Sequence, residues 1–258
     1  MFEDYDVKKM PGHWLLARMG KRVLRPGGKE LTTKMISKLN VNPSSVVVEF
    51  APGMGNTSRL IFSKNPKEYF GVDQSEEAVS NLNSITNNRA YRFVKRNILD
   101  SELYDDLATV VLGEAVLTMQ TDIHKEKIIG EAYRILKKGG KYGIHEICLY
   151  PGNLDVKFKN KIRKDLSDAV HVNARPMTIP EWEKMFINAG FKIESVMTNP
   201  MHLLRPIRLI KDEGFRVFKI LFNVLTTPHA LNRIKKMRGV FNRYEKNMKS
   251  ISIVAIKE

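Results

Sequence analysis

The chain has 258 residues, of which 43% are hydrophobic, which is enough for a packed core and too many for a disordered chain. Its formal net charge of +15 favours anionic partners, such as nucleic acid, a lipid surface or a small anion, and does not bear on the fold. The single cysteine, Cys148, excludes a disulfide framework within the chain and favours a reducing cytoplasm, and no stretch approaches the roughly 18 apolar residues of a membrane span.

Two amphipathic helices are predicted first, over residues 13–24 and 30–39, and the first residues do not resemble a signal peptide. From residue 46 short apolar runs alternate with helical patterns. The predicted strands are 46–50, 69–73, 91–94, 108–112 and 141–147, and the predicted helices are 57–63, 76–85 and 125–136. The last of these helices is expected to stop at Lys137-Lys138-Gly139-Gly140.

Further helices are predicted over 153–170 and 180–189, and the last two strands over 191–197 and 250–256. This alternation predicts an α/β fold: a Rossmann-like, seven-stranded, mostly parallel sheet with helices on both faces. We expect an N-terminal helical lid at 1–40, a core at 41–199, a helical insertion at 200–248 and the final strand at 249–258.

A loop rich in small residues, Glu49-Phe50-Ala51-Pro52-Gly53-Met54-Gly55, follows the first strand. Its Gly-x-Gly is a weak signal alone, but a buried carboxylate at Glu49 needs a partner, such as a ligand ammonium. Asp73, at the end of the second strand, either accepts ribose hydroxyls or only caps the next helix. A nicotinamide dinucleotide fits less well, because Ser58 stands at the third glycine position and Glu49 repels a pyrophosphate.

Five ordered segments resemble the motifs of class I S-adenosylmethionine (SAM)-dependent methyltransferases. They are VVVEFAPGMGNTSRL, YFGVDQS, FVKRNILD, LATVVLGEAVLTM and GEAYRILKKGGKYGIHE, and IPEWEKMFINAGFKIESV is similar to the segment before the family's final strands. The resemblance covers roughly residues 30 to 198. It is closest to small-molecule enzymes that include the quinone-biosynthesis C-methyltransferases.

The resemblance implies SAM as cofactor, with S-adenosylhomocysteine as its product. It assigns the methionine part of SAM to the loop residues Glu49, Ala51, Pro52, Gly53 and Gly55. It assigns the ribose to Asp73 and Gln74, the adenine to Asn97 and Ile98, and the methyl donor region to Glu114. Ala51 departs from the family, which usually has glycine there, and this is costly only if the backbone φ must be positive.

Methyl transfer needs no fixed catalytic motif, because the cofactor carries the chemistry. Gly113-Glu114-Ala115-Val116 follows the fourth strand where enzymes that methylate amino groups of DNA bases and glutamine carry Asn/Asp-Pro-Pro-Tyr/Phe, which argues against those activities. His145 and Glu146 are the candidate general bases, on opposite faces of the fifth strand, and a structural role for His145 is an equal alternative. No metal-ligand spacing is present, and we expect no metal.

The acceptor pocket is predicted to include His13, Arg175 and His202, for which plain loop and packing roles are the alternative. The segment 203–225 is predicted to be an amphipathic helix with Ile207, Phe215 and Phe218 on its apolar face. It suits a lid, an anionic membrane surface or a core-packed helix. Residues 232–249 form a second basic helix, and residues 200–258 together hold 13 Lys and Arg against 4 Asp and Glu.

The sequence therefore predicts a cytoplasmic SAM-dependent methyltransferase, with peripheral membrane contact through 203–225. Its acceptor is a small apolar or anionic molecule enclosed by residues 1–28 and 200–248. Two alternatives stay open: an RNA methyltransferase that uses the basic surface, which is less favoured because no RNA-binding module is recognisable, and a SAM-binding protein without catalytic activity.

Overall fold

The computed structural model describes residues 6–201, 203–204 and 206–258, and within them eight strands form one sheet. The strands are β1 (Val46–Phe50), β2 (Glu68–Asp73), β3 (Tyr91–Lys95), β4 (Ala108–Glu114), β5 (Leu136–Leu149), β6 (Met177–Thr178), β7 (Phe191–Pro200) and β8 (Met248–Lys257). Their order is β3-β2-β1-β4-β5-β8-β7, with β6 paired to the end of β5. Strands β1 to β5 are parallel and β8 runs antiparallel between β5 and β7, which confirms the predicted α/β sheet. The two-residue β6 escaped prediction, because it is too short to carry a pattern.

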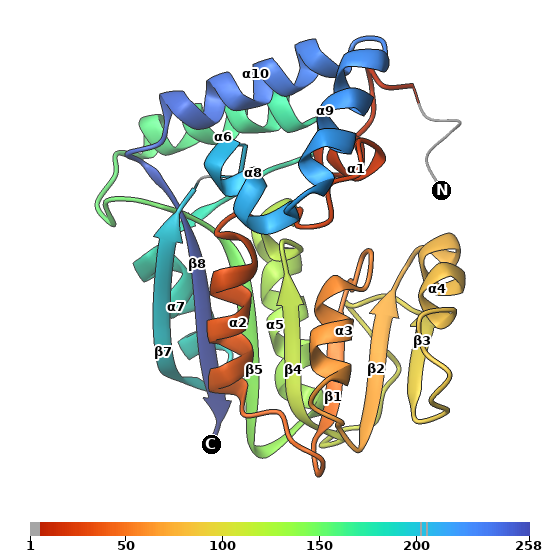
Figure 1. The fold of residues 1–258 in the computed structure, drawn as a ribbon. Helices are drawn as coiled ribbons and strands as arrows, with labels where there is room; N and C mark the ends of the chain where they lie inside the picture. The colour runs from red at the N-terminus through yellow and green to blue at the C-terminus, as the bar shows by residue number, and fades with distance from the viewer. Residues whose placement is uncertain (1–5, 202, 205) are drawn as a thin grey trace.

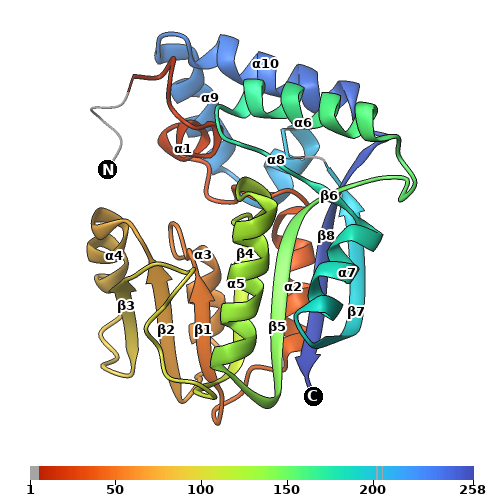
Figure 2. The same ribbon diagram turned by 180° about the vertical axis from the view of Figure 1, so that it is seen from behind.

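Helices cover both faces of the sheet and cap one of its ends (Figures 1 and 2). They are α1 (Gly12–Arg18), α2 (Gly28–Leu39), α3 (Asn56–Phe62), α4 (Glu76–Asn83), α5 (Asp122–Ile135), α6 (Val156–Val170), α7 (Ile179–Asn188), α8 (Pro206–Glu213), α9 (Arg216–Thr226) and α10 (Ala230–Arg243), with a 3-10 turn η1 (Leu117–Met119). Helices α2 and α3 lie on one face and α5 and α7 on the other. Helices α1, α6, α8, α9 and α10 stand beyond the carboxyl ends of the parallel strands, where open α/β sheets bind ligands.

Three predicted helix boundaries were wrong. The first helix ends at Arg18 rather than residue 24, because Lys21 N–H bonds back to the Leu16 carbonyl and the chain continues as an extended strap, residues 19–27. The predicted helix 203–225 is two helices, because Gly214 takes φ 57° between α8 and α9. The predicted helix 232–249 ends at Arg243 in α10, and residues 248–249 belong to β8. The helix expected to stop at residues 137–140 does end there, at Ile135, and these four residues are part of β5.

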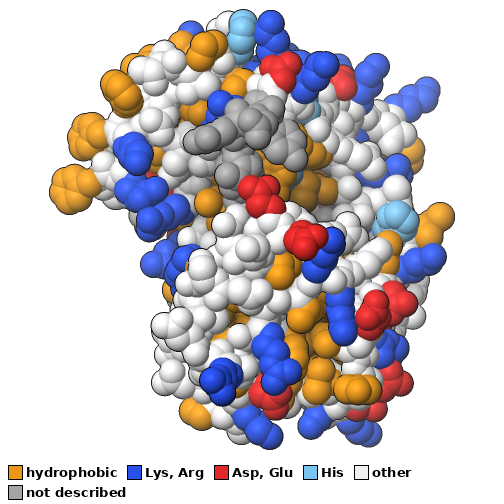
Figure 3. Space-filling view, turned by 90° about the vertical axis from the view of Figure 1, so that its right-hand side faces the viewer, with side chains coloured by type: hydrophobic (Ala, Val, Ile, Leu, Met, Phe, Trp, Pro, Cys, Tyr) orange, Lys and Arg blue, Asp and Glu red, His pale blue; other side chains and the backbone are white. Residues whose placement is uncertain are grey.

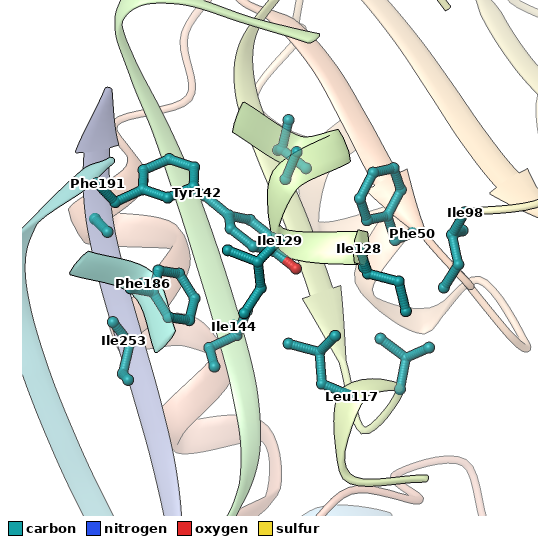
Figure 4. Close-up of a cluster of buried hydrophobic side chains, with 14 of the residues drawn as sticks. Phe50, Ile98, Leu117, Ile128, Ile129, Tyr142, Ile144, Phe186, Phe191 and Ile253 are labelled. Atoms are coloured by element: carbon teal, nitrogen blue, oxygen red, sulfur yellow. The ribbon is translucent and has the colours of Figure 1, made fainter. Parts of the chain in front are cut away.

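The main core lies between the sheet and the helices α5 and α7 (Figure 4). Tyr142 on β5 stacks on Phe186 of α7, with ring centroids 5.4 Å apart, and Phe50 meets the edge of Tyr142 at 6.4 Å. The opposite face of the sheet packs on α2 through Met35, Ile36 and Leu39. These two layers fix the strand ends that carry the site.

The helical cap has a hydrophobic cluster of its own, separate from the two that cover the sheet. Its buried members include Leu15, Leu16, Leu166, Met237 and Phe241 from α1, α6 and α10. Arg233 of α10 ties the chain before α1 to the cap by donating to the carbonyls of Val7, Lys8 and Met10. The cap is therefore a packed layer, built from the N-terminal segment, from α6 and from the helices before β8. Within the described residues, no helix has the length and apolar character to cross a membrane.

Candidate active site

A cavity of about 310 Å³ lies between the carboxyl ends of the strands and the cap. Its floor holds the loop after β1, the end of β2 and the end of β4: Glu49, Ala51, Pro52, Gly53, Asp73 and Glu114. Its roof comes from the strap and the cap helices: His13, Trp14, Leu16, Arg22, Leu24, Leu166, Val170, Met237 and Phe241. The volume lies in the range of small-molecule sites, and the cavity has a polar end and an apolar end.

Glu49, at the end of β1, is a buried carboxylate, and no cation among the described residues contacts it. It accepts hydrogen bonds from Tyr69 Oη at 2.5 Å and from Ser58 Oγ at 2.9 Å. Burial raises the pKa of Glu49 to about 7, against the lowering effect of these two hydroxyls. A cation placed in the cavity beside Glu49 would stabilise its charged form, so the site suits a ligand ammonium.

Asp73 closes the same end of the cavity from β2. It accepts a hydrogen bond from Ser75 N–H at 2.9 Å, and burial raises its pKa. Ala51 adopts φ 51°, the left-handed region, and its N–H bonds the Val72 carbonyl at 2.8 Å. Residue 51 thus has the positive φ that glycine adopts without strain. In an alanine this conformation costs about 1 kcal/mol.

Glu114, at the end of β4, is the centre of a buried polar network. Arg25 Nε lies 3.1 Å from its Oε1, His145 Nδ1 lies 3.1 Å from the same oxygen, and Thr32 and Thr57 donate hydroxyl hydrogen bonds to the carboxylate. Burial opposes ionisation, but Arg25 and His145 outweigh it and lower the pKa of Glu114 to about 2. The ion pair between Arg25 and Glu114 joins the strap to the sheet, because Arg25 belongs to the strap and Glu114 to β4.

The two candidate bases occupy structural positions. His145 is fully buried behind Glu114, contacts Glu114 and Thr32, and is absent from the cavity wall. Glu146 borders the cavity but accepts the N–H groups of Val116, Leu117 and Thr118 and the Thr118 hydroxyl, all at 3.0 Å or less. Both oxygens of Glu146 are therefore engaged in holding the loop after β4. His145 does not reach the cavity wall, and a role of Glu146 as general base stays a prediction.

Of the residues predicted to line an acceptor pocket, His13 borders this cavity and Arg175 does not. His13 lines the cavity beside Trp14, with ring centroids 4.7 Å apart, and burial lowers its pKa to about 4, so the ring is neutral near pH 7. Arg175 lies outside this cavity and pairs with Asp122 at 3.3 Å. His202 lies outside the described residues.

Four predicted cofactor residues do not reach the cavity wall. Gln74 and Asn97 are exposed and Ile98 is buried in the main core, so their contacts with a cofactor stay a prediction. Gly55 serves packing, because a Cβ there would stand 2.6 Å from Leu82.

Arg25, Thr32 and Thr57 were missed by sequence reasoning. Arg25 stands before Pro26-Gly27-Gly28, a sequence that predicts only a turn, and a lone hydroxyl on a helix carries no periodic signal. Across the described residues, no group of three or more His, Cys, Asp or Glu side chains could hold a metal ion.

Known proteins resemble this chain over most of its length. A family model described as a methyltransferase domain matches residues 42–190. An uncharacterized protein of Haemophilus influenzae is 30% identical over 256 residues, which are 97% of this chain and all of the relative. The crystal structure of MccD protein superposes with a TM-score of 0.71 at 20% identity, covering 91% of this chain and 99% of that one. Phosphoethanolamine N-methyltransferase 2 of Haemonchus contortus, solved with SAM, gives a TM-score of 0.72 at 16% identity, covering 99% of this chain and 58% of that one.

Arg25→Met should lower the free energy of unfolding by about 3–5 kcal/mol near pH 7, because it leaves the Glu114 carboxylate buried without its cation. Without Arg25 the pKa of Glu114 rises, so lowering the pH protonates the stranded carboxylate. The deficit should therefore shrink between about pH 7 and about pH 5. Urea unfolding of the unaltered protein and of Arg25→Met, between about pH 5 and about pH 7, measures this difference in the free energy of unfolding.

Lys34→Met is the control, because the pair that Lys34 forms with Glu30 on α2, at 3.1 Å, is exposed. It should cost less than about 1 kcal/mol. A deficit for Arg25→Met that keeps its size at the lower pH would contradict the assignment to Glu114.

Proposed function

The chain belongs to the SAM-dependent methyltransferases, and from that premise we propose that it methylates a small apolar acceptor held in the cavity under the helical cap. The observation that carries the proposal is one continuous cavity, which runs from Glu49 and Asp73 to a wall made of Trp14, Val170 and Phe241. When bound, the cofactor supplies a methyl group on a sulfonium, which an acceptor nucleophile attacks in line.

The polar end of the cavity fits the cofactor. Glu49 provides a buried carboxylate for the ammonium group, and Asp73 provides acceptors for the ribose hydroxyls. Beside Gly53 a Cβ would meet no atom nearer than 3.9 Å, so the loop backbone leaves open space for the ligand. We assign the methionine part to this loop and the sulfonium region to the neighbourhood of Glu114.

The apolar end of the cavity supports an apolar acceptor rather than an anionic one. Leu16, Leu166, Met201 and Met237 join the aromatic wall there. Of the two arginines in the cavity wall, Arg25 is already paired with Glu114, and Arg22 is exposed to water, which weakens its attraction for an acceptor anion. The resemblance to quinone-biosynthesis enzymes makes an aromatic acceptor ring part of this proposal.

The acceptor is held by the shape of the cavity and by the exclusion of water, and we assign no general base. Trp14 offers a ring face, and the neutral His13 offers a hydrogen bond to a polar substituent. The enclosing cap holds donor and acceptor in line and keeps water from the reacting atoms. An acceptor that ionises readily, or reacts through carbon, fits a site of this kind.

Asp73→Ala should weaken SAM binding by about 10- to 100-fold, because it removes a charged hydrogen-bond acceptor from the ribose. Isothermal titration calorimetry measures the affinity. Asp100→Ala is the matched control, since Asp100 also follows a strand at this edge of the sheet but is exposed and outside the cavity wall. Equal affinities of Asp73→Ala and the unaltered protein would refute the ribose assignment.

Glu49 should release a proton when SAM binds. Because its pKa is about 7 in the free protein, a neighbouring ammonium lowers that pKa and expels the proton near neutrality. Calorimetry near pH 7 in buffers of different ionisation enthalpy should show this release, and the apparent affinity should rise with pH through about 7. The proton release should vanish in Glu49→Gln. An undiminished release in that variant would contradict the assignment of the SAM ammonium to Glu49.

Val170→Trp should plug the apolar end of the cavity. We expect kcat/KM for the acceptor to fall at least about tenfold with SAM affinity unchanged, because the indole fills acceptor space only. The assay is S-adenosylhomocysteine formation over a panel of small phenols, quinols and aliphatic acceptors. Val156→Trp is the control, at a position on the same helix that is 63% exposed. Absence of turnover across the whole panel, with SAM bound, would argue against a small apolar acceptor.

A further inference from the structure

The cap carries several exposed apolar side chains on α8, on α9 and at Phe215 between them. Figure 3 shows hydrophobic side chains standing out from the cap at the upper left edge of the molecule, with Lys and Arg side chains beside them. The exposed set, called here the apolar ridge, is Ile207, Ile210, Phe215, Phe218, Leu221, Phe222 and Leu225, of which Phe215 is 93% and Phe222 66% exposed. Single exposed apolar residues are ordinary on a protein surface, but seven on and between two consecutive helices are a marker of contact with another apolar phase.

The ridge faces outward because the opposite side of α9 is occupied. Phe218, Leu221, Phe222 and Leu225 recur at the spacing of one helix face, while Ile220 and Val224 on the other face are buried in the cap cluster. Asn223 Nδ2 donates to the Met19 carbonyl at 3.0 Å. The helix is thus held by its inner face, and the ridge cannot turn inward without breaking these contacts.

The neighbouring α8 is fastened to the same strap. Glu213 accepts the N–H groups of Arg22 at 2.8 Å and Val23 at 2.9 Å, and Arg208 donates to the Gly27 carbonyl. The strap in turn contributes Arg22, Leu24 and Arg25 to the cavity wall. Both ridge helices are therefore a fixed part of the cap.

The charge around the ridge is positive on its outer side. The two acids of α8 are turned inward: the side chain of Asp212 is 3% exposed and pairs with Arg208 at 3.0 Å, and that of Glu213 is 1% exposed. Lys219, next to Phe218 on α9, is exposed, as is Arg22 on the adjoining strap. A ridge of Phe, Leu and Ile flanked by cations matches the composition of helices that lie in the interface of an anionic bilayer.

We propose that the ridge docks this protein onto an anionic lipid surface, with Phe215, Phe218 and Phe222 inserted among the acyl chains and Lys219 at the headgroups. The proposal goes beyond the proposed function and does not depend on the acceptor. Charge favours this occupant over a second copy of the chain, because pairing two ridges would bring their cations together, whereas a leaflet containing phosphatidylglycerol supplies the opposite charge.

Vesicle flotation tests the docking. The unaltered protein should float with vesicles of phosphatidylcholine and phosphatidylglycerol in equal parts and stay unbound with phosphatidylcholine alone. The double variant Phe218→Ser, Phe222→Ser should bind the anionic vesicles on the order of tenfold more weakly, and Lys219→Glu should bind them several-fold more weakly. Raising the salt concentration should release the unaltered protein.

The controls change equally exposed residues away from the ridge. Tyr104→Ser with Ile123→Ser removes two large side chains that are 83% and 67% exposed, and Lys138→Glu reverses an exposed charge on β5. All variants are checked for an unchanged melting temperature and for unchanged SAM affinity, which separates failure to dock from failure of the site.

Three results would overturn the proposal. The first is no binding of the unaltered protein to anionic vesicles. The second is binding of the Phe218→Ser, Phe222→Ser variant as strong as that of the control variants, and the third is binding of the unaltered protein to phosphatidylcholine vesicles as strong as to anionic ones. A dimer in light scattering that the double variant dissociates, without vesicle binding, would assign the ridge to self-association instead.

Discussion

The ion pair between Arg25 and Glu114 is the contact on which the shape of the site depends. Glu114 ends the central strand β4, and Arg25 comes from the strap that joins α1 to α2, so one buried contact of 3.1 Å fastens the roof of the cavity to its floor. Thr32, Thr57 and His145 complete the shell around the carboxylate. A buried pair contributes modest net stability, but the loss of one partner leaves the other charge buried and unpaired, which is costly.

Around this contact the molecule is organised as two packed layers with a cavity between them. The sheet and its helices have their own cores, and the cap has another, centred on α1, α6 and α10. The cavity inherits its two characters from these layers: carboxylates where the strands end, and aliphatic and aromatic side chains where the cap helices face down. The charged donor and the apolar acceptor that we propose would share one space for that reason.

The two candidate bases show that a residue at the carboxyl end of a strand can be occupied by hydrogen bonds within the protein. His145 and Glu146 stand at the carboxyl end of β5, where the sequence argument placed them, yet both are engaged inside the protein. Three N–H groups converge on Glu146, and a buried carboxylate that satisfies them holds the loop after β4 rather than a substrate. Such partners come from residues about 30 positions away, which no local pattern discloses.

The sequence by itself determined where most strands lie along the chain, the loop of residues 49–55 and the acids at 49 and 73, because alternating apolar runs and strand-end residues are local signals. It also located the basic insertion. Only the tertiary structure decided that Arg25 is a site residue, that residues 203–225 break into two helices with an outward apolar ridge, and that the cavity closes under the cap. The physical reason is that burial and charge pairing between distant segments depend on packing, which a period along the chain does not encode.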